Sequence, residues 1–201
     1  MGRVQSWEVS DALWKKVEPL IPRFARDPNK QYKRHPGGGR KPLPARRVFE
    51  GIVYVLRTGC HWKALPKEQF GCPSAIHRYF LEWAQAGFFL ALWKAGLVDY
   101  DELKGIAWDW QSIDGAMTKA PLAQESVGRN PTDRGKKGTK RHLLVDGRGT
   151  PLAVVITGAS RHEVTQVETV LDHVVGDRPD PTAEEPQHLR ADKGARLHTT
   201  C

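Results

Sequence analysis

The first hundred residues alternate amphipathic stretches with proline-rich breaks, and this pattern predicts helices. Ser10 precedes an amphipathic stretch that stops at a cluster of prolines, and serine is a typical N-cap residue. A second stretch opens after Pro44, carries apolar residues at helical spacing on one face, and stops at Gly59. Residues 73–87 repeat this spacing and predict a third helix, and residues 90–97 predict a fourth.

After Gly105 the hydrophobic period changes from helical spacing to alternation, which predicts strands. The second and third strands are separated by the turn at 146–149, so we expect them to form a hairpin. The predicted elements are strands at 106–114, 141–146 and 151–157, a helix at 162–175, and a short strand at 188–191. Helices followed by a mixed set of strands and a helix predict an α+β fold.

We expect two domains, a helical one at 1–104 and a mixed one at 105–201. A segment rich in Pro, Gly, Lys and Arg predicts a flexible basic linker near 23–44. The first domain holds 18 Lys and Arg against 10 Asp and Glu, whereas the second holds 13 of each, so the first carries the whole net charge of +8. A basic excess confined to one domain is typical of polyanion binding, although a solvated basic surface has the same composition.

Composition narrows the protein class further. The chain has 201 residues, 39% of them hydrophobic, and seven tryptophans, which is enough for a packed core. No apolar run approaches the roughly 18 residues that span a bilayer, and the N-terminus lacks a signal-peptide pattern. Three cysteines are an odd and sparse set, which favours a reducing compartment over a disulfide framework. We therefore expect a cytoplasmic protein without a membrane partner.

Two aspartates occupy equivalent places in the predicted sheet. Asp114 ends the first predicted strand and Asp192 follows the last one. If these strands are parallel neighbours, the two carboxylates converge at one edge of the sheet. Two close carboxylates repel each other unless a cation lies between them, and Mg²⁺ (or Mn²⁺) suits such ligands. The alternative is that both are ordinary strand-end residues, as we expect for Asp146 in its hairpin turn.

Several longer sequence motifs add a family resemblance. The motifs PLIP at 19–22, GRKP at 39–42, GIVYVLRTGC at 51–60, SIDG at 112–115, NPTDRGKKGTKRHLLVDGRGTPLAVVITGASRHE at 130–163 and ADKG at 191–194 carry it. With them, the chain resembles bacterial insertion-sequence transposases of the IS5 type, within the IS4/IS5 superfamily, over nearly its whole length. The resemblance implies a helix-turn-helix-like first domain and a ribonuclease-H-like DDE catalytic domain.

The resemblance also implies a chemistry. The family uses three acids, Asp, Asp and Glu, around divalent metal, and by motif position Asp114 and Asp192 are the first two, catalytic and metal-binding. After ADKG the chain departs from the family pattern, so we expect the catalytic domain to be incomplete and the chain truncated before the third acid, by a frameshift or by decay. The isolated chain is then expected to be inactive.

The implied partner is double-stranded DNA, both the terminal inverted repeats and the target, in a nucleoid-associated protein. A homo-oligomer or a completing frameshift product is the expected protein partner. Phosphate or base contacts are expected from Arg46, Arg47, Ser74, His77 and Arg78 in the helical domain, and from Arg134, Lys136, Lys137, Lys140 and Arg141 in the second. For each of these residues a solvated surface position is the alternative. His162 and Glu163 follow the third predicted strand, and we expect them to cap the next helix; a catalytic or metal-binding role is the alternative.

Two other functions fit the same sequence. A non-catalytic DNA-binding repressor that occupies the element ends needs no third acid. A decayed transposase fragment needs no activity at all. Strand cleavage that depends on Asp114 separates the enzyme from both.

Overall fold

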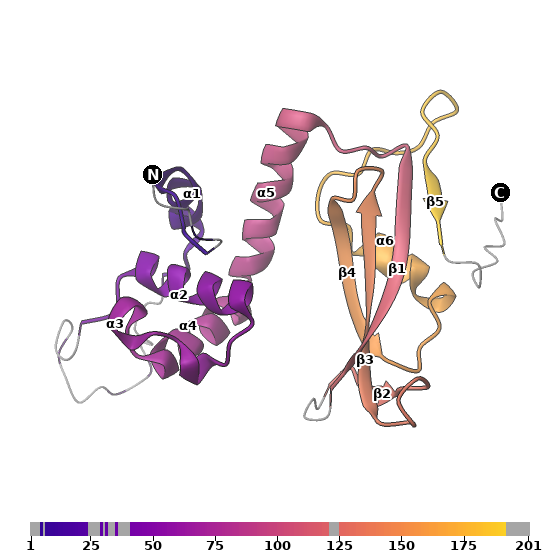
Figure 1. Ribbon diagram of the computed structural model, residues 1–201. Coiled ribbons are helices and arrows are strands. Elements are labelled where there is room, and N and C mark those ends of the chain that lie inside the picture. The colour runs from indigo at the N-terminus through magenta and orange to yellow at the C-terminus, as the bar shows by residue number, and fades with distance from the viewer. Residues whose placement is uncertain are drawn as a thin grey trace. The chain divides into compact units, whose positions relative to one another are not determined.

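The computed structural model describes residues 5, 7–23, 29, 31, 35, 41–120 and 125–191 (Figure 1). The chain divides into two compact units, residues 1–93 and 94–201. The division falls inside helix α5 (Phe88–Lys104), whose last residue coincides with the expected domain boundary. No helix among the described residues is long and apolar enough to span a bilayer.

The first unit is helical, as predicted. Ser10 Oγ accepts a hydrogen bond from the Leu13 backbone N–H at 3.2 Å, which confirms the expected N-cap. Gly59 closes the second helix with a φ of 67°, a left-handed conformation that glycine adopts without steric cost. The elements before α5 are α1 (Asp11–Val17), η1 (Glu18–Leu20), α2 (Ala45–Thr58), η2 (Trp62–Ala64), α3 (Lys67–Phe70) and α4 (Pro73–Gln85).

The core of this unit lies between α2 and α4. Val48, Ile52 and Val55 recur on one face of α2 and are buried, as their helical spacing predicts. Leu56, which the same spacing placed on this face, is 60% exposed, so that part of the prediction was wrong. A Cβ at Gly51 would lie 3.3 Å from Ile76 Cγ2, so the absence of a side chain lets α2 and α4 approach closely. The connection between these helices contains the short helices η2 and α3.

The second unit is built on a mixed sheet whose main body has the order β4-β3-β1-β5. β1 pairs with β3 antiparallel and with β5 parallel, and β3 and β4 form the predicted hairpin. The short β2, which the sequence pattern did not predict, pairs with the start of β3. The strands are β1 (Trp110–Lys119), β2 (Gly128–Arg129), β3 (Lys137–Asp146), β4 (Pro151–Gly158) and β5 (His188–Arg190).

The first strand lies later in the chain than predicted. The sequence pattern placed it at 106–114, with Asp114 at its end, whereas β1 runs from Trp110 to Lys119 and holds Asp114 in its middle. Both bounds of that prediction were wrong. The residues before β1 instead form a loop, in which Trp108 N–H bonds to Ile106 O and Ala107 N–H bonds to Asp146 Oδ2.

The two faces of the sheet differ in burial. Ile113, Leu144 and Leu152 are buried on the face that packs against α6 (Val167–Asp172), and we call this the covered face (Figure 1). The helix predicted at 162–175 is shorter in the structure, with η3 (Val164–Gln166) forming its first turn. The other face, which we call the open face, carries Leu143, Val154 and Ile156, and all three are exposed.

Candidate functional site

Asp114 lies on the open face of β1. Residues directly opposite each other in an antiparallel pair share a face, and Asp114 pairs with the exposed Leu143, whereas Gly115 pairs with the buried His142. The Gly115 backbone N–H donates a hydrogen bond to Asp114 Oδ1 at 2.8 Å. The Asp114 side chain is exposed, so a ligand can reach it from solvent.

The strand β5, which precedes Asp192 in the sequence, is the parallel neighbour of β1. β1 and β5 run parallel and pair Trp110 with His188 and Ser112 with Arg190, positions that are 78 apart in each case. The Trp110 and His188 rings stack at 4.6 Å between centroids, which strengthens this short ladder. Asp192 itself lies outside the described residues, so its position stays a prediction.

The donor chemistry at Asp114 fits a hard divalent cation. An exposed carboxylate is the oxygen ligand that Mg²⁺ and Mn²⁺ prefer. Within the described parts of the chain, no three His, Cys, Asp or Glu side chains gather to hold a metal ion.

Lys140, expected to contact DNA, lies on the covered face behind Asp114. Its Nζ forms an ion pair with Glu163 Oε1 at 2.7 Å, and its side chain is only 11% exposed. Glu163 occupies the N-cap position of η3 without making a capping hydrogen bond, so the expected capping role was wrong. This pair was not predicted from the sequence, although the alternation of β3 places Lys140 on the same face as the apolar Leu144.

His142 lies beside this pair and is fully buried. Its Nε2 is 2.8 Å from Thr157 Oγ1, and its Nδ1 is buried without a hydrogen-bond partner among the described residues. Burial lowers the pKa of His142, and the positive charge of Lys140 lowers it further. The imidazole is therefore neutral at pH 7.

A basic loop leads from β2 into β3. Asn130 organises it: its N–H donates to Lys136 O at 2.8 Å, and its carbonyl oxygen accepts from Gly135 N–H at 3.0 Å. Arg134 lies in this loop with a φ of 51°, a left-handed conformation that is uncommon for a residue with a side chain. Four of the five residues expected to bind DNA in this unit have exposed side chains, namely Arg134, Lys136, Lys137 and Arg141.

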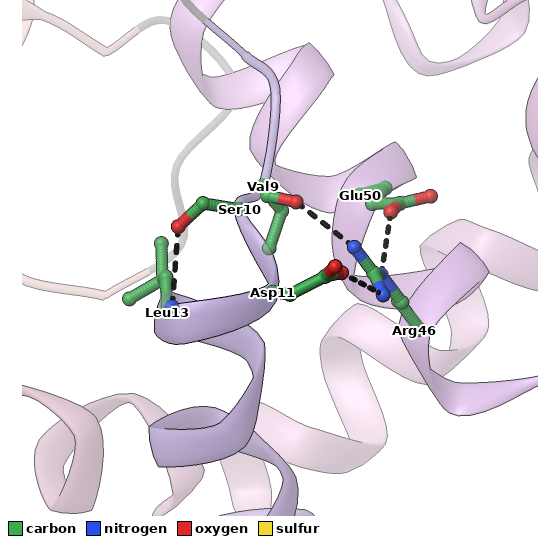
Figure 2. Close-up of polar contacts among 6 residues, drawn as sticks. All are labelled: Val9, Ser10, Asp11, Leu13, Arg46 and Glu50. Atoms are coloured by element: carbon green, nitrogen blue, oxygen red, sulfur yellow. Dashed lines mark hydrogen bonds and ion pairs between the residues drawn. The ribbon is translucent and has the colours of Figure 1, made fainter.

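Arg46, the first expected phosphate contact, joins α2 to the start of α1 (Figure 2). Its guanidinium forms an ion pair with Asp11 at 2.7 Å, contacts Glu50 at 3.1 Å and donates to Val9 O at 3.1 Å. The hydrogen bond to Asp11 contributes most to raising the pKa of Arg46 above its ordinary value. Arg47, the next residue of α2, is exposed.

The predicted reader residues of α4 differ in accessibility. Ser74 is exposed, with its Oγ 3.2 Å from Cys72 Sγ. Arg78 is exposed and its Nε lies 3.5 Å from a carboxylate oxygen of Glu82, one turn later. His77 is half-buried and its ring lies 4.8 Å from that of Trp62. Contacts of these residues with DNA stay predictions.

Asp146 is a turn residue, as expected. Its Oδ1 accepts the backbone N–H groups of Arg148 at 2.9 Å and Thr150 at 2.7 Å, and its Oδ2 accepts that of Ala107 at 3.1 Å. Burial alone raises the pKa of this carboxyl, but these donors outweigh burial and hold the pKa below its ordinary value. The carboxylate therefore fastens the loop before β1 to the β3–β4 hairpin.

Comparison with known proteins gives matches in both halves of the chain. Residues 9–93 match the family described as "Putative transposase of IS4/5 family", and residues 101–199 match the family described as "Transposase DDE domain". The chain is 30% identical over 125 residues, 61% of this chain and 80% of the relative, to "Insertion element IS402 uncharacterized 16.2 kDa protein" of Burkholderia cepacia.

A second relative from the same organism is "Putative transposase for insertion sequence element IS402". It is 41% identical over 71 residues, which cover 34% of this chain and 33% of that relative. The chain therefore aligns with about a third of the length of this curated relative. No solved structure matches the chain.

Proposed function

The chain belongs to the IS4/IS5-type insertion-sequence transposases, and we propose that it binds the ends of an insertion sequence and contributes two carboxylates to a metal-dependent strand-transfer site. The observation that carries the metal site is the parallel register of β1 and β5, which pairs residues 78 positions apart, as in Ser112 with Arg190. Asp114 and Asp192 are separated by the same 78 positions. In this proposal the register continues and brings the two carboxylates side by side.

The second unit acts as a ribonuclease-H-like domain in this proposal. Support comes from the strand order β4-β3-β1-β5, with β5 parallel to β1 and α6 packed on one face. The open face then receives the DNA, because it carries the exposed Asp114. Arg141 lies on the same face, since it pairs with Ala116, two residues beyond Asp114 on β1.

Asp114 and Asp192 hold Mg²⁺ or Mn²⁺ in this proposal. Such an ion, when bound, activates a hydroxyl and stabilises a leaving oxygen in phosphoryl transfer. The chain's own residues orient the reactants: the Gly115 N–H holds the Asp114 carboxylate, and the exposed basic side chains neutralise phosphates. No covalent protein nucleophile is required. Lys140 is left out of the DNA surface because its side chain is buried and paired.

The helical unit acts as the sequence reader, with α2 and α4 in a helix-turn-helix-like arrangement. Ser74, Arg78 and the exposed edge of His77 lie on α4, which enters the major groove in this proposal. Arg47 contacts phosphate, which requires no sequence information. Arg46 supports the reader indirectly, because its guanidinium is already engaged by Asp11 and Glu50.

Two assays on the full chain test the proposed function. A gel-shift assay compares DNA bearing the terminal repeats with a scrambled duplex, and a cleavage assay uses the same labelled DNA with Mg²⁺. We expect specific binding in both the wild type and Asp114→Asn. Cleavage by the wild type and by the control Asp180→Asn, a loop substitution, but not by Asp114→Asn, supports the metal-dependent site. Specific binding without cleavage by the wild type supports a DNA-binding repressor instead. Loss of specific binding as well contradicts both functions.

A further inference from the structure

The Lys140–Glu163 ion pair packs against the backbone of β1 directly behind Asp114. Lys140 comes from β3 and Glu163 from the residue before η3, so the pair joins two elements. A Cβ placed on Gly115 would collide with Glu163 Oε1 and lie 2.6 Å from Lys140 Cε. The missing side chain at Gly115 is therefore what allows the pair to lie on the strand.

Gly115 also contacts Asp114 itself. Its backbone N–H donates to Asp114 Oδ1 at 2.8 Å, so the same residue faces the ion pair at its Cα and holds the carboxylate through its peptide N–H. A shift of this peptide moves the donor that orients the carboxylate. We infer that Lys140 and Glu163 are positioning residues, which fix the Asp114 carboxylate through Gly115. The inference rests on the proposed function, in which Asp114 is a metal ligand.

Stability alone is a poor reason for this pair. Two charges lose their hydration when they are buried, and apolar residues of similar volume often stabilise a fold equally well or better. Lys140 is 11% exposed and Glu163 28%, and their neighbours on the covered face include the buried Ile113 and Leu144. An ion pair fixes geometry better than apolar packing does, because its length and direction are defined. Such a defined geometry suits a support behind a catalytic carboxylate.

The test measures the orientation of Asp114 by NMR on the full chain without metal. Three-bond couplings to the Asp114 Hβ atoms report the χ1 rotamer, and the Gly115 amide proton shift reports its hydrogen bond. The variants are Lys140→Met, Glu163→Gln and the double substitution, which leaves no unpaired buried charge and protects against unfolding. Lys140→Arg tests rescue. The control is Lys119→Met. It removes the ion pair between Asp133 and Lys119, the last residue of β1, the strand that carries Asp114.

We expect a single Asp114 rotamer in the wild type, the control and Lys140→Arg. In the single and double neutral variants the couplings should average, and the Gly115 shift should move toward its value in Asp114→Ala, which lacks the acceptor. Retention of wild-type couplings and shift in the folded double variant overturns the inference, because a merely structural pair predicts that result.

Cleavage assays with Mg²⁺ separate this inference from the proposed function. If both hold, Lys140→Met/Glu163→Gln lowers kcat by on the order of 10-fold or more, as misplacement of a reacting group does, with KM for DNA unchanged. A wild type that does not cleave, but whose Asp114 couplings still depend on the pair, disproves the proposed catalysis and leaves the positioning intact. Wild-type kcat in the double variant contradicts the positioning.

Discussion

The Asp146 carboxylate offers a direct test of how the second unit is held together. It is 2% exposed and accepts backbone N–H groups from Ala107, Arg148 and Thr150. Asp146→Ala removes the acceptor for all three. Hydrogen bonds to a charged group contribute about 1.5–3 kcal/mol each and are not additive, so we expect a loss of about 3–5 kcal/mol in unfolding free energy. Asp146→Asn keeps one acceptor oxygen, so this variant should lose about 1.5–3 kcal/mol of unfolding free energy.

The same carboxylate predicts a pH dependence. Its pKa in the folded chain lies below the ordinary value, so folding favours the ionised form. The stabilisation is fully present above the unfolded pKa of about 3.9 and is lost as the pH falls through the folded value. The difference between wild type and Asp146→Asn should therefore be largest near pH 7 and shrink below about pH 4, where the unfolded carboxyl is mostly protonated.

Urea denaturation of the full chain, followed by circular dichroism at pH 7 and pH 3.5, measures both effects. Asp180→Ala is the matched control, because Asp180 is exposed in a loop, and it should change the unfolding free energy by less than about 0.5 kcal/mol. An Asp146→Ala variant as stable as this control at pH 7 refutes the reasoning. So does an Asp146→Asn difference that grows as the pH falls.

Three further predictions address other parts of the chain. Arg46→Met should speed hydrogen exchange of the α1 amides, because it removes the contacts to Asp11, Glu50 and Val9. The control Arg47→Met should leave the exchange rates unchanged. Equal rates in the two variants would show that Arg46 does not hold α1 in place. Gly59→Ala should cost about 1 kcal/mol of unfolding free energy because φ is 67°, whereas Gly96→Ala inside α5 should stabilise by about 0.5–1 kcal/mol; a loss at both positions contradicts the backbone argument. The unfolding free energy should fall as the pH drops below about 6.5, because His142 takes up a proton in the unfolded chain more readily than in the folded one. The dependence of the unfolding free energy on pH should be shallower in His142→Gln. The same pH dependence in both proteins refutes this prediction.

Local sequence signals predicted the helical unit well. The apolar positions of α2 recur every turn, and Gly59 ends the helix, so both bounds follow from nearby residues. Helix α5 (Phe88–Lys104) was predicted too short, at 90–97. Its end is held by Asp101, which accepts the Gly105 and Ile106 N–H groups, and by a distant residue: Arg148 donates to the carbonyls of Lys104, at 2.7 Å, and Gly105. A contact that spans more than forty positions leaves no mark in the local periodicity.

The predicted start of β1 was wrong for a similar reason. Tryptophans at 108 and 110 continue the alternation that begins at Ile106, so the local pattern favours an early strand. The hydrogen bond from Ala107 N–H to Asp146 Oδ2 instead commits this segment to a loop. Beyond Asp114 the strand continues because β3 is long enough to pair with it as far as Lys119. Partner strand length, like distant capping, is a property of the assembled sheet.

The strand alternation of β3 could have distinguished its two adjacent basic residues from the sequence alone. Lys140 and Arg141 are adjacent, so in a strand they must point to opposite faces. The structure turns Lys140 inward to Glu163 and leaves Arg141 exposed on the face of Asp114. In our proposals the two neighbouring cations therefore have different roles: Arg141 neutralises phosphate, and Lys140 supports the strand that carries the candidate metal ligand. Counting the two charges together, as a DNA-binding patch, hides that difference, because the strand period separates them before any ligand arrives.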